Sequence, residues 1–119
     1  MEKNINVFEF IKNGLTENNG FILRQKIEEV LKDLKENDVI ILNFEKIFLF
    51  ATPFFNTSIG FFVLTLGPEQ FDKIFRIIKI SDLGMNTYQH SYENAVENYN
   101  KKLNIEVVGE ITKANIEKS

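Results

Sequence analysis

Apolar residues recur every three or four positions in two stretches of the chain, which is the spacing of a helix with one buried face. The earlier stretch predicts a helix over residues 21–36, and the later one predicts a helix over residues 87–103. The first stripe comprises Leu23, Ile27, Val30, Leu31 and Leu34, and the second comprises Tyr88, Tyr92, Ala95, Val96, Tyr99 and Leu103.

A further helix is predicted between these two, from a start signal as well as from its stripe. Thr52 is a preferred N-cap residue, and Pro53 suits the first helical position because its missing N–H would be unpaired there. Gly67 and Pro68 are expected to end the helix. Its core stripe comprises Phe55, Ile59, Phe62, Val63 and Leu66.

Runs of β-branched and apolar residues indicate the strands. Residues 39–42 form a continuous run, which Asn43 and Phe44 extend, and they predict a central strand covered on both faces. Residues 5–11 and 76–80 predict a first and a last strand, and residues 105–111 predict a short extra one.

The remaining segments complete an alternation of strands and helices. Residues 69–75 predict a short helix, whereas residues 16–20 and 81–86 are polar and predict loops. Helices that alternate with strands indicate an α/β layer structure with a small, largely mixed sheet. We expect one domain over residues 1–111 and a polar, frayed tail over residues 112–119.

The composition is typical of a folded domain with a phenylalanine-rich core. The chain has 119 residues, with 12 Phe and no Trp, and this length is enough to bury one core. The formal net charge is -3, and acidic and basic residues alternate over residues 28–36. A nucleic-acid partner is therefore not expected, because it would require basic residues gathered on one face.

The residue content also bears on compartment and membrane contact. Cysteine is absent, which excludes disulfides and thiolate chemistry. The first residues lack an apolar run of signal-peptide length, and polar residues interrupt the most apolar stretch, residues 44–66. We expect a cytoplasmic protein without a membrane partner.

No residue constellation predicts catalysis. His90 is the only histidine and lies off the apolar stripe of its helix, so neither a metal site nor a cofactor is expected. Asp72 and Asp82 are expected to be surface or capping residues rather than an acid–base pair. Neither a glycine-rich phosphate loop after a strand nor a Gly-x-Ser-x-Gly elbow is present. The sequence therefore predicts a protein that is not an enzyme.

The helix that begins at Pro53 has more apolar residues than one stripe requires. Either this helix is packed on two sides, or its second face binds a partner protein or a second copy of the chain as a homodimer. Gly60 would permit close approach of another backbone. The candidate partner-binding residues on this face are Phe54, Asn56, Thr57, Ser58, Phe61 and Leu64.

Thr52 has two interpretations. Its hydroxyl can serve only as a helix cap, or it can be a phosphorylation site. A phosphate there would lie near the positive end of the helix dipole and could accept hydrogen bonds from free N–H groups.

Four stretches of the chain resemble the STAS-like family of bacterial regulatory domains, the DUF4325 group. They are residues 20–24, 39–44, 52–60 and 93–99, of which the Thr-Pro-Phe-Phe-Asn-Thr-Ser-Ile-Gly stretch is the most specific. The resemblance covers roughly residues 20 to 100. It implies a STAS-type fold, with a small mixed sheet and helices packed mainly on one side.

The resemblance also implies a function. STAS domains are similar to anti-anti-sigma factors, which bind an ATPase-type kinase partner and are switched by phosphorylation at the start of the helix that follows a central strand. In this sequence that junction is Ala51-Thr52-Pro53. We therefore expect a regulatory protein–protein interaction module, whose partner is a histidine-kinase-type ATPase or a sigma-factor regulator.

The alternative is a STAS-like domain that senses a small ligand such as a nucleotide. Such a ligand would bind near the same helix start, where Lys46 and Arg24 are the few basic groups.

Overall fold

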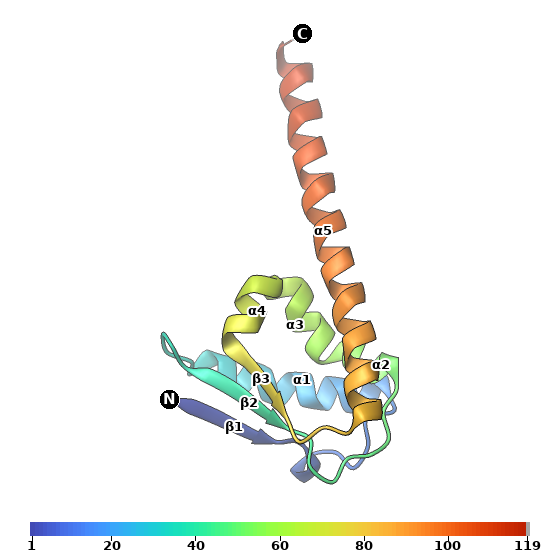
Figure 1. The fold of residues 1–119 in the computed structure, drawn as a ribbon. Helices are drawn as coiled ribbons and strands as arrows, with labels where there is room; N and C mark the ends of the chain where they lie inside the picture. Colours follow the sequence, from blue (N-terminus) through green and yellow to red (C-terminus); the bar gives the residue numbers. More distant parts are fainter. Residues whose placement is uncertain (119) are drawn as a thin grey trace.

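Three parallel strands form the sheet on which the helices pack (Figure 1). A computed structural model describes the backbone of residues 1–118 and the side chains of residues 1–103. The strands are β1 (Glu2–Asn6), β2 (Val39–Asn43) and β3 (Phe75–Ile78), in the order β1-β2-β3. The predicted α/β class and the central position of β2 are confirmed. The strand directions differ from the mixed sheet that was expected, because helical crossovers join the strands and both pairs run parallel.

The first strand lies earlier than the prediction of residues 5–11. Its register with β2 ends where Asn6 pairs with Asn43, because β2 itself ends there. The chain then turns into the short 3-10 helix η1 (Val7–Glu9), in which the carbonyl of Val7 accepts from the N–H of Phe10 at 3.0 Å. The prediction for the last strand was correct to within two residues.

Alternate residues of the strands face the helices. Ile5, Ile40, Leu42 and Phe75 are buried on that face, and the register pairs Ile5 with Leu42 and Ile40 with Phe75. On the opposite face Ile41 is only half-buried. The helices therefore lie mainly on one side, as predicted, whereas the prediction that β2 is covered on both faces is wrong.

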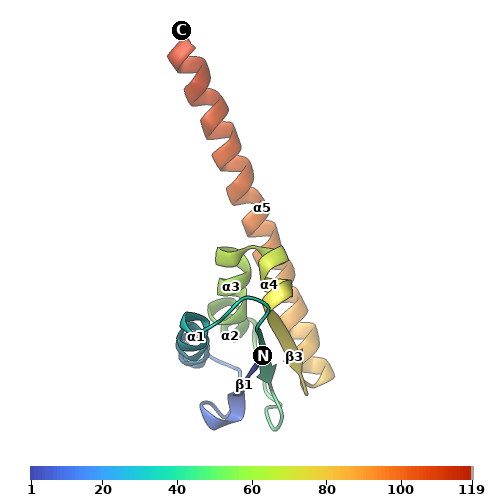
Figure 2. The same ribbon diagram turned by 90° about the vertical axis from the view of Figure 1, so that its left-hand side faces the viewer.

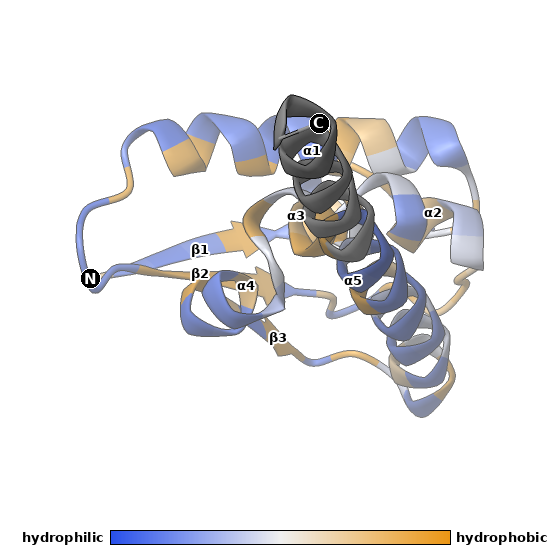
Figure 3. Ribbon diagram, turned by 90° about the horizontal axis from the view of Figure 1, so that it is seen from above, coloured by the Kyte–Doolittle hydropathy of each residue, from blue (hydrophilic) through white to orange (hydrophobic). Residues whose placement is uncertain are grey.

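The helices form a layer in which α2 and α3 lie between α1 and α5 (Figures 2 and 3). Figure 3 shows that α3 is strongly hydrophobic and that the coloured part of the α5 ribbon is mostly hydrophilic. Among the described residues, none of the helices has both the length and the apolar character that crossing a membrane requires. The helices are α1 (Glu17–Lys32), α2 (Thr52–Thr57), α3 (Ile59–Leu66), α4 (Pro68–Ile74) and α5 (Asp82–Lys118).

Two helices begin earlier than predicted because hydroxyl side chains cap them. The Thr16 hydroxyl accepts from the Asn19 N–H at 3.1 Å, and the Ser81 hydroxyl accepts from the Gly84 N–H at 3.1 Å. The loops predicted at residues 16–20 and 81–86 are therefore mostly helical.

The end of α5 also differs from the prediction. Residues 105–111, predicted as a strand, continue this helix, and the tail predicted over residues 112–119 falls on its last turns as far as Lys118. Ser119 lies outside the described residues. Leu103, predicted to face inward, is 41% exposed.

The helix predicted from Pro53 to Leu66 is broken in two at Ser58. Both the N–H and the hydroxyl of Ser58 donate to the carbonyl of Phe54, at 3.1 and 2.8 Å. A hydroxyl that bonds to the preceding turn bends or interrupts a helix, and here Gly60, a weak helix former, follows at once. The predicted end at Gly67 is confirmed, with φ of 88° and its N–H bonded to Val63.

Gly20 sets how closely α1 approaches α2. A Cβ placed on Gly20 would lie 1.8 Å from the Thr57 hydroxyl and 2.6 Å from the carbonyl oxygen of Phe54. The second of these contacts is with backbone, which cannot rotate away.

We expect Gly20→Ala to destabilise the protein by about 1–3 kcal/mol, because overpacking outweighs the better helix propensity of alanine. Urea denaturation measures this change. Gln25→Ala, at an exposed site on the same helix, is the control and should change stability by less than about 0.5 kcal/mol. A Gly20→Ala protein as stable as the wild type would contradict the tight α1–α2 contact.

Asp38 anchors the start of β2. Its carboxylate accepts from the Lys35 N–H at 3.0 Å and from the α-ammonium group of Met1 at 3.0 Å. The backbone hydrogen bond from Lys35, followed by the interaction with Met1, lowers the pKa of Asp38 below its ordinary value of 3.8. A lowered pKa in the folded state means that the ionised carboxylate stabilises the fold above pH 4 and that this stabilisation is lost as the pH falls through the folded-state pKa.

We therefore expect Asp38→Asn to be less stable than the wild type at pH 7, and the difference to shrink as the pH is lowered through the range below 4. Chemical denaturation at a series of pH values measures both effects. Asp33→Asn, at an exposed carboxylate nearby, is the control. A difference between Asp38→Asn and the wild type that does not vary with pH would exclude the ionised carboxylate as its cause.

Candidate functional site

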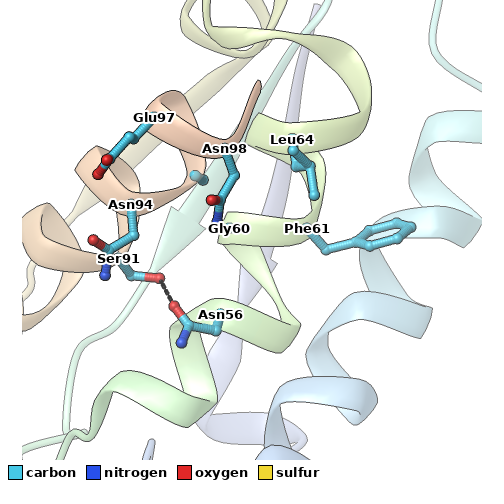
Figure 4. A pocket seen from close by; sticks show the side chains of 9 residues that line it. Asn56, Gly60, Phe61, Leu64, Ser91, Asn94, Glu97 and Asn98 are labelled. Atoms are coloured by element: carbon cyan, nitrogen blue, oxygen red, sulfur yellow. Dashed lines mark hydrogen bonds between the residues drawn. The ribbon is translucent and has the colours of Figure 1, made fainter. Parts of the chain in front are cut away.

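A groove with mixed polar and apolar walls lies between α3 and α5 (Figure 4). Its volume is about 380 Å³. The end of α2 and the face of α3 form one wall, and α5 forms the other. Its lining residues are Asn56, Gly60, Phe61, Leu64, Ser91, Asn94, Ala95, Glu97 and Asn98.

Gly60 allows the two walls to approach. A Cβ at this position would lie 3.2 Å from the Ser91 hydroxyl and 3.0 Å from the Phe55 carbonyl oxygen. The prediction that Gly60 permits a close approach is therefore confirmed, and the approaching element is α5 of the same chain. Without this glycine the walls would separate at the bottom of the groove.

One hydrogen bond joins the walls. The buried Ser91 hydroxyl donates to the Asn56 side-chain oxygen at 2.5 Å, shown as the dashed line in Figure 4. Asn94 and Asn98 follow Ser91 at i+3 and i+7, so all three lie on one face of α5. This face presents carboxamides, each of which can both donate and accept hydrogen bonds.

The groove carries little charge. Glu97 is its only ionisable lining residue, and its carboxylate lies 3.2 Å from the Lys101 ammonium group. The described residues hold no cluster of three or more side chains suited to a metal ion. A ligand of this groove would therefore have to be recognised by hydrogen bonds and shape rather than by charge.

A family described as a STAS-like domain of unknown function (DUF4325) matches residues 20–85. The chain belongs to this family. No curated protein and no solved structure gives a significant match. The matched part of the STAS-like domain includes the α2–α3 wall of the groove, while Ser91, Asn94 and Asn98 follow it in the chain.

Two of the predicted partner-binding residues of the STAS-like domain are not on its surface. Phe54 and Ser58 are both fully buried. The Phe54 ring packs edge-on against Phe55 at 5.1 Å, and Ser58 is held by its bonds to the preceding turn. The prediction that these two contact a partner is therefore wrong.

Two other predicted residues face α1. The Arg24 guanidinium lies 3.4 Å from the centre of the Phe61 ring, which points toward α1 in Figure 4. The Thr57 hydroxyl donates to the Pro53 carbonyl at 2.9 Å and lies against Gly20. The helix is thus packed on two sides, which was one of the two interpretations of its excess apolar residues.

Asn56 and Leu64 line the groove, with part of Phe61 at its edge. The other wall, on α5, was missed. Ser91, Asn94 and Asn98 form a polar stripe beside the apolar stripe of Tyr88, Tyr92 and Tyr99, and this regular spacing of small polar residues was the available signal.

Thr52 is the first residue of α2, and Ala51 occupies the N-cap position, so the prediction that Thr52 caps the helix is wrong. Thr52 is half-exposed, and its hydroxyl makes no hydrogen bond within the described residues. Loss of the Thr52 hydroxyl would therefore remove no hydrogen bond of the fold among the described residues.

The remaining titratable residues do not meet in the groove. His90 is exposed, as predicted. Asp72 accepts from the Tyr92 hydroxyl at 3.0 Å, and Asp82 is exposed at the start of α5. Burial raises the pKa of Tyr88, whose ring packs against Phe55 at 5.7 Å, so its hydroxyl stays protonated at neutral pH.

Proposed function

We propose that the chain is a regulatory protein–protein interaction module without catalytic activity, and that its partner binds in the α3–α5 groove. The observation that supports this most is the wall of Ser91, Asn94 and Asn98 opposite Leu64. Carboxamides and an apolar edge suit a peptide segment, whose main chain needs both donors and acceptors and whose side chains need apolar contact.

The same chemistry favours binding over catalysis. Carboxamides and hydroxyls keep one protonation state near neutral pH, so they cannot act as general acids or bases as histidine or a carboxylate does. Glu97, the one carboxylate, is paired with Lys101 at the exposed edge. Glu97 is also exposed, whereas the ionisable group of a catalytic site is usually held in a partly buried cleft.

Membership of the STAS-like family supports a regulatory role. The partner that we propose is a histidine-kinase-type ATPase or a sigma-factor regulator in the cytoplasm of a bacterial cell. A second copy of the chain, as a homodimer, is the other protein partner that the groove could accept.

A nucleotide-sensing domain is the second candidate. The volume of about 380 Å³ lies within the range of small-ligand pockets. The lining includes no lysine or arginine to neutralise a phosphate. We therefore rank a protein segment above a nucleotide.

Asn94→Arg tests the proposed groove. Asn94 is exposed, so the larger charged side chain should fill the groove and leave the fold intact. We expect the wild type to retain a partner in affinity purification from the native cell, and the purified partner to bind the variant at least about tenfold more weakly by calorimetry.

Asn100→Arg is the matched control, because it places the same change on another exposed face of α5. It should bind as the wild type does. If both variants lose affinity for the partner equally, or if Asn94→Arg keeps its affinity, the partner binds elsewhere on the protein. A nucleotide that raises the melting temperature of the wild type but not of Asn94→Arg would favour the sensing function instead.

The variant Thr52→Ala tests whether phosphorylation of Thr52 switches partner binding. We expect Thr52→Ala to keep wild-type stability, because the hydroxyl makes no hydrogen bond within the described residues. The same variant should lose regulation of partner binding, and intact-mass measurement on protein from cells should show one phosphate on the wild type alone. Normal regulation in Thr52→Ala would exclude the switch.

A further inference from the structure

Two exposed apolar side chains project from the loop that joins β2 to α2. Phe48 and Leu49 are 70% and 58% exposed, whereas their neighbours Ile47 and Phe50 are buried in the core. Because the residues on both sides are fixed inward, the two apolar side chains cannot turn in with them. We call Phe48 and Leu49 the apolar tip.

Backbone hydrogen bonds fix the tip in place. The Gly14 N–H donates to the Leu49 carbonyl at 2.7 Å, and the Ala51 N–H donates to the Gly14 carbonyl at 2.7 Å. The turn before the tip is also defined, since Lys46 has φ of 73°. The segment after η1 and the loop after β2 therefore lie side by side at the end of the molecule opposite the C-terminus of α5 (Figures 1 and 2).

Two lysines on the segments that lead to the tip approach one aromatic ring: Lys46 precedes Phe48 by two residues, and Lys12 precedes Gly14, which bonds to Leu49, by two. The ammonium groups of Lys12 and Lys46 lie 4.0 and 5.9 Å from the centre of the Phe8 ring. Neither makes an ion pair in the part of the chain that the structure describes, whereas the nearby Glu45 is paired with Lys79 at 3.5 Å. The Lys12 ammonium group donates to the Phe8 carbonyl at 2.9 Å. Together with the exposed apolar side chains, these two cations without carboxylate partners would complement a partner that is both anionic and apolar.

We propose that the apolar tip, with Lys12 and Lys46, binds an acidic amphipathic segment of a partner protein, in which one or two carboxylates stand beside a large apolar residue. This surface is separate from the α3–α5 groove and does not depend on the function proposed for it.

The size and charge of the surface favour such a segment over other occupants. Two projecting side chains provide far less area than the roughly 800 Å² a side of a stable interface between folded proteins. An anionic membrane presents an extended layer of negative charge to the whole chain, whose net charge is -3, whereas the carboxylates of a short segment interact mainly with charges within about one Debye length, which include Lys12 and Lys46.

The test is selection of a phage-displayed library of random short peptides on the immobilised full-length chain. The selected peptides should combine Asp or Glu with Phe, Leu or Ile. Their affinity for Phe48→Ser/Leu49→Ser should fall by about tenfold or more, measured by fluorescence anisotropy. Lys12→Glu/Lys46→Glu should lose affinity as well, and added salt should weaken binding to the wild type.

Matched controls separate this surface from others. Leu103→Ser and Lys102→Glu change an exposed apolar residue and an exposed lysine on α5 and should keep the wild-type affinity. Asn94→Arg should also keep it, because peptides that this variant loses belong to the groove. Circular dichroism and urea denaturation of each variant establish that a loss of binding does not reflect unfolding.

Several outcomes would overturn the proposal. These are failure to select any peptide, selection of peptides without acidic residues, and equal affinity for the wild type and the tip variants. Sedimentation with phosphatidylglycerol vesicles, absent with phosphatidylcholine and abolished by Phe48→Ser/Leu49→Ser, would assign the tip to a membrane. A concentration-dependent dimer lost in the same variant would assign it to a second copy.

Discussion

Four phenylalanine rings at the end of β2 fix the positions of the segments on which both proposed surfaces depend. Phe44 packs against Phe50, Phe54 and Phe55 at centroid distances of 5.9 to 6.5 Å, and Phe50 stacks on Phe55 at 5.5 Å. Burying each ring stabilises the fold by about 1.5–3 kcal/mol. These rings come from β2's continuation, the following loop and α2, so none of the three segments can move without opening the cluster. The loop must then expose Phe48 and Leu49, since the inward positions are already occupied.

Contacts on two sides hold α2 between α1 and α5: the carbonyl oxygen of Phe54 faces Gly20 of α1, and the Phe55 ring packs against Tyr88 of α5. Small residues allow the close packing that results: Gly20 faces Thr57 on the α1 side, and Gly60 faces Ser91 on the α5 side. α5 contacts α3 closely at Gly60. Farther along, its polar stripe of Ser91, Asn94 and Asn98 faces α3 across the groove and does not pack against it. The break at Ser58 lets α2 and α3 take different directions, so that Asn56 reaches Ser91 while Leu64 remains farther along the groove.

The sequence predicts the features of this fold that have a strong period or a local stop signal. The stripe from Leu23 to Leu34, the apolar run of β2 and the end of α3 at Gly67 are of this kind. It predicts element starts less well, because the caps at Thr16 and Ser81 stand among other polar residues and read as loop. The helical spacing of apolar residues identifies one buried face, and Phe54 lies outside it. Burial of a second face depends on tertiary neighbours, which the sequence pattern does not show. The polar residues of the α5 wall, Ser91, Asn94 and Asn98, give no hydrophobic signal in the sequence.

The two surfaces would select partners by different physical means. In the groove, the carboxamides and the Ser91–Asn56 bond discriminate by hydrogen-bond geometry, which salt hardly affects. At the apolar tip, the charges of Lys12 and Lys46 act over several ångströms and weaken with ionic strength. Phe55 contacts Tyr88 of α5, and Phe50 lies against Gly84. The ring cluster therefore fixes the position of the apolar tip relative to α5. A partner that contacts both would gain affinity from the fixed separation, since neither surface has to be ordered on binding.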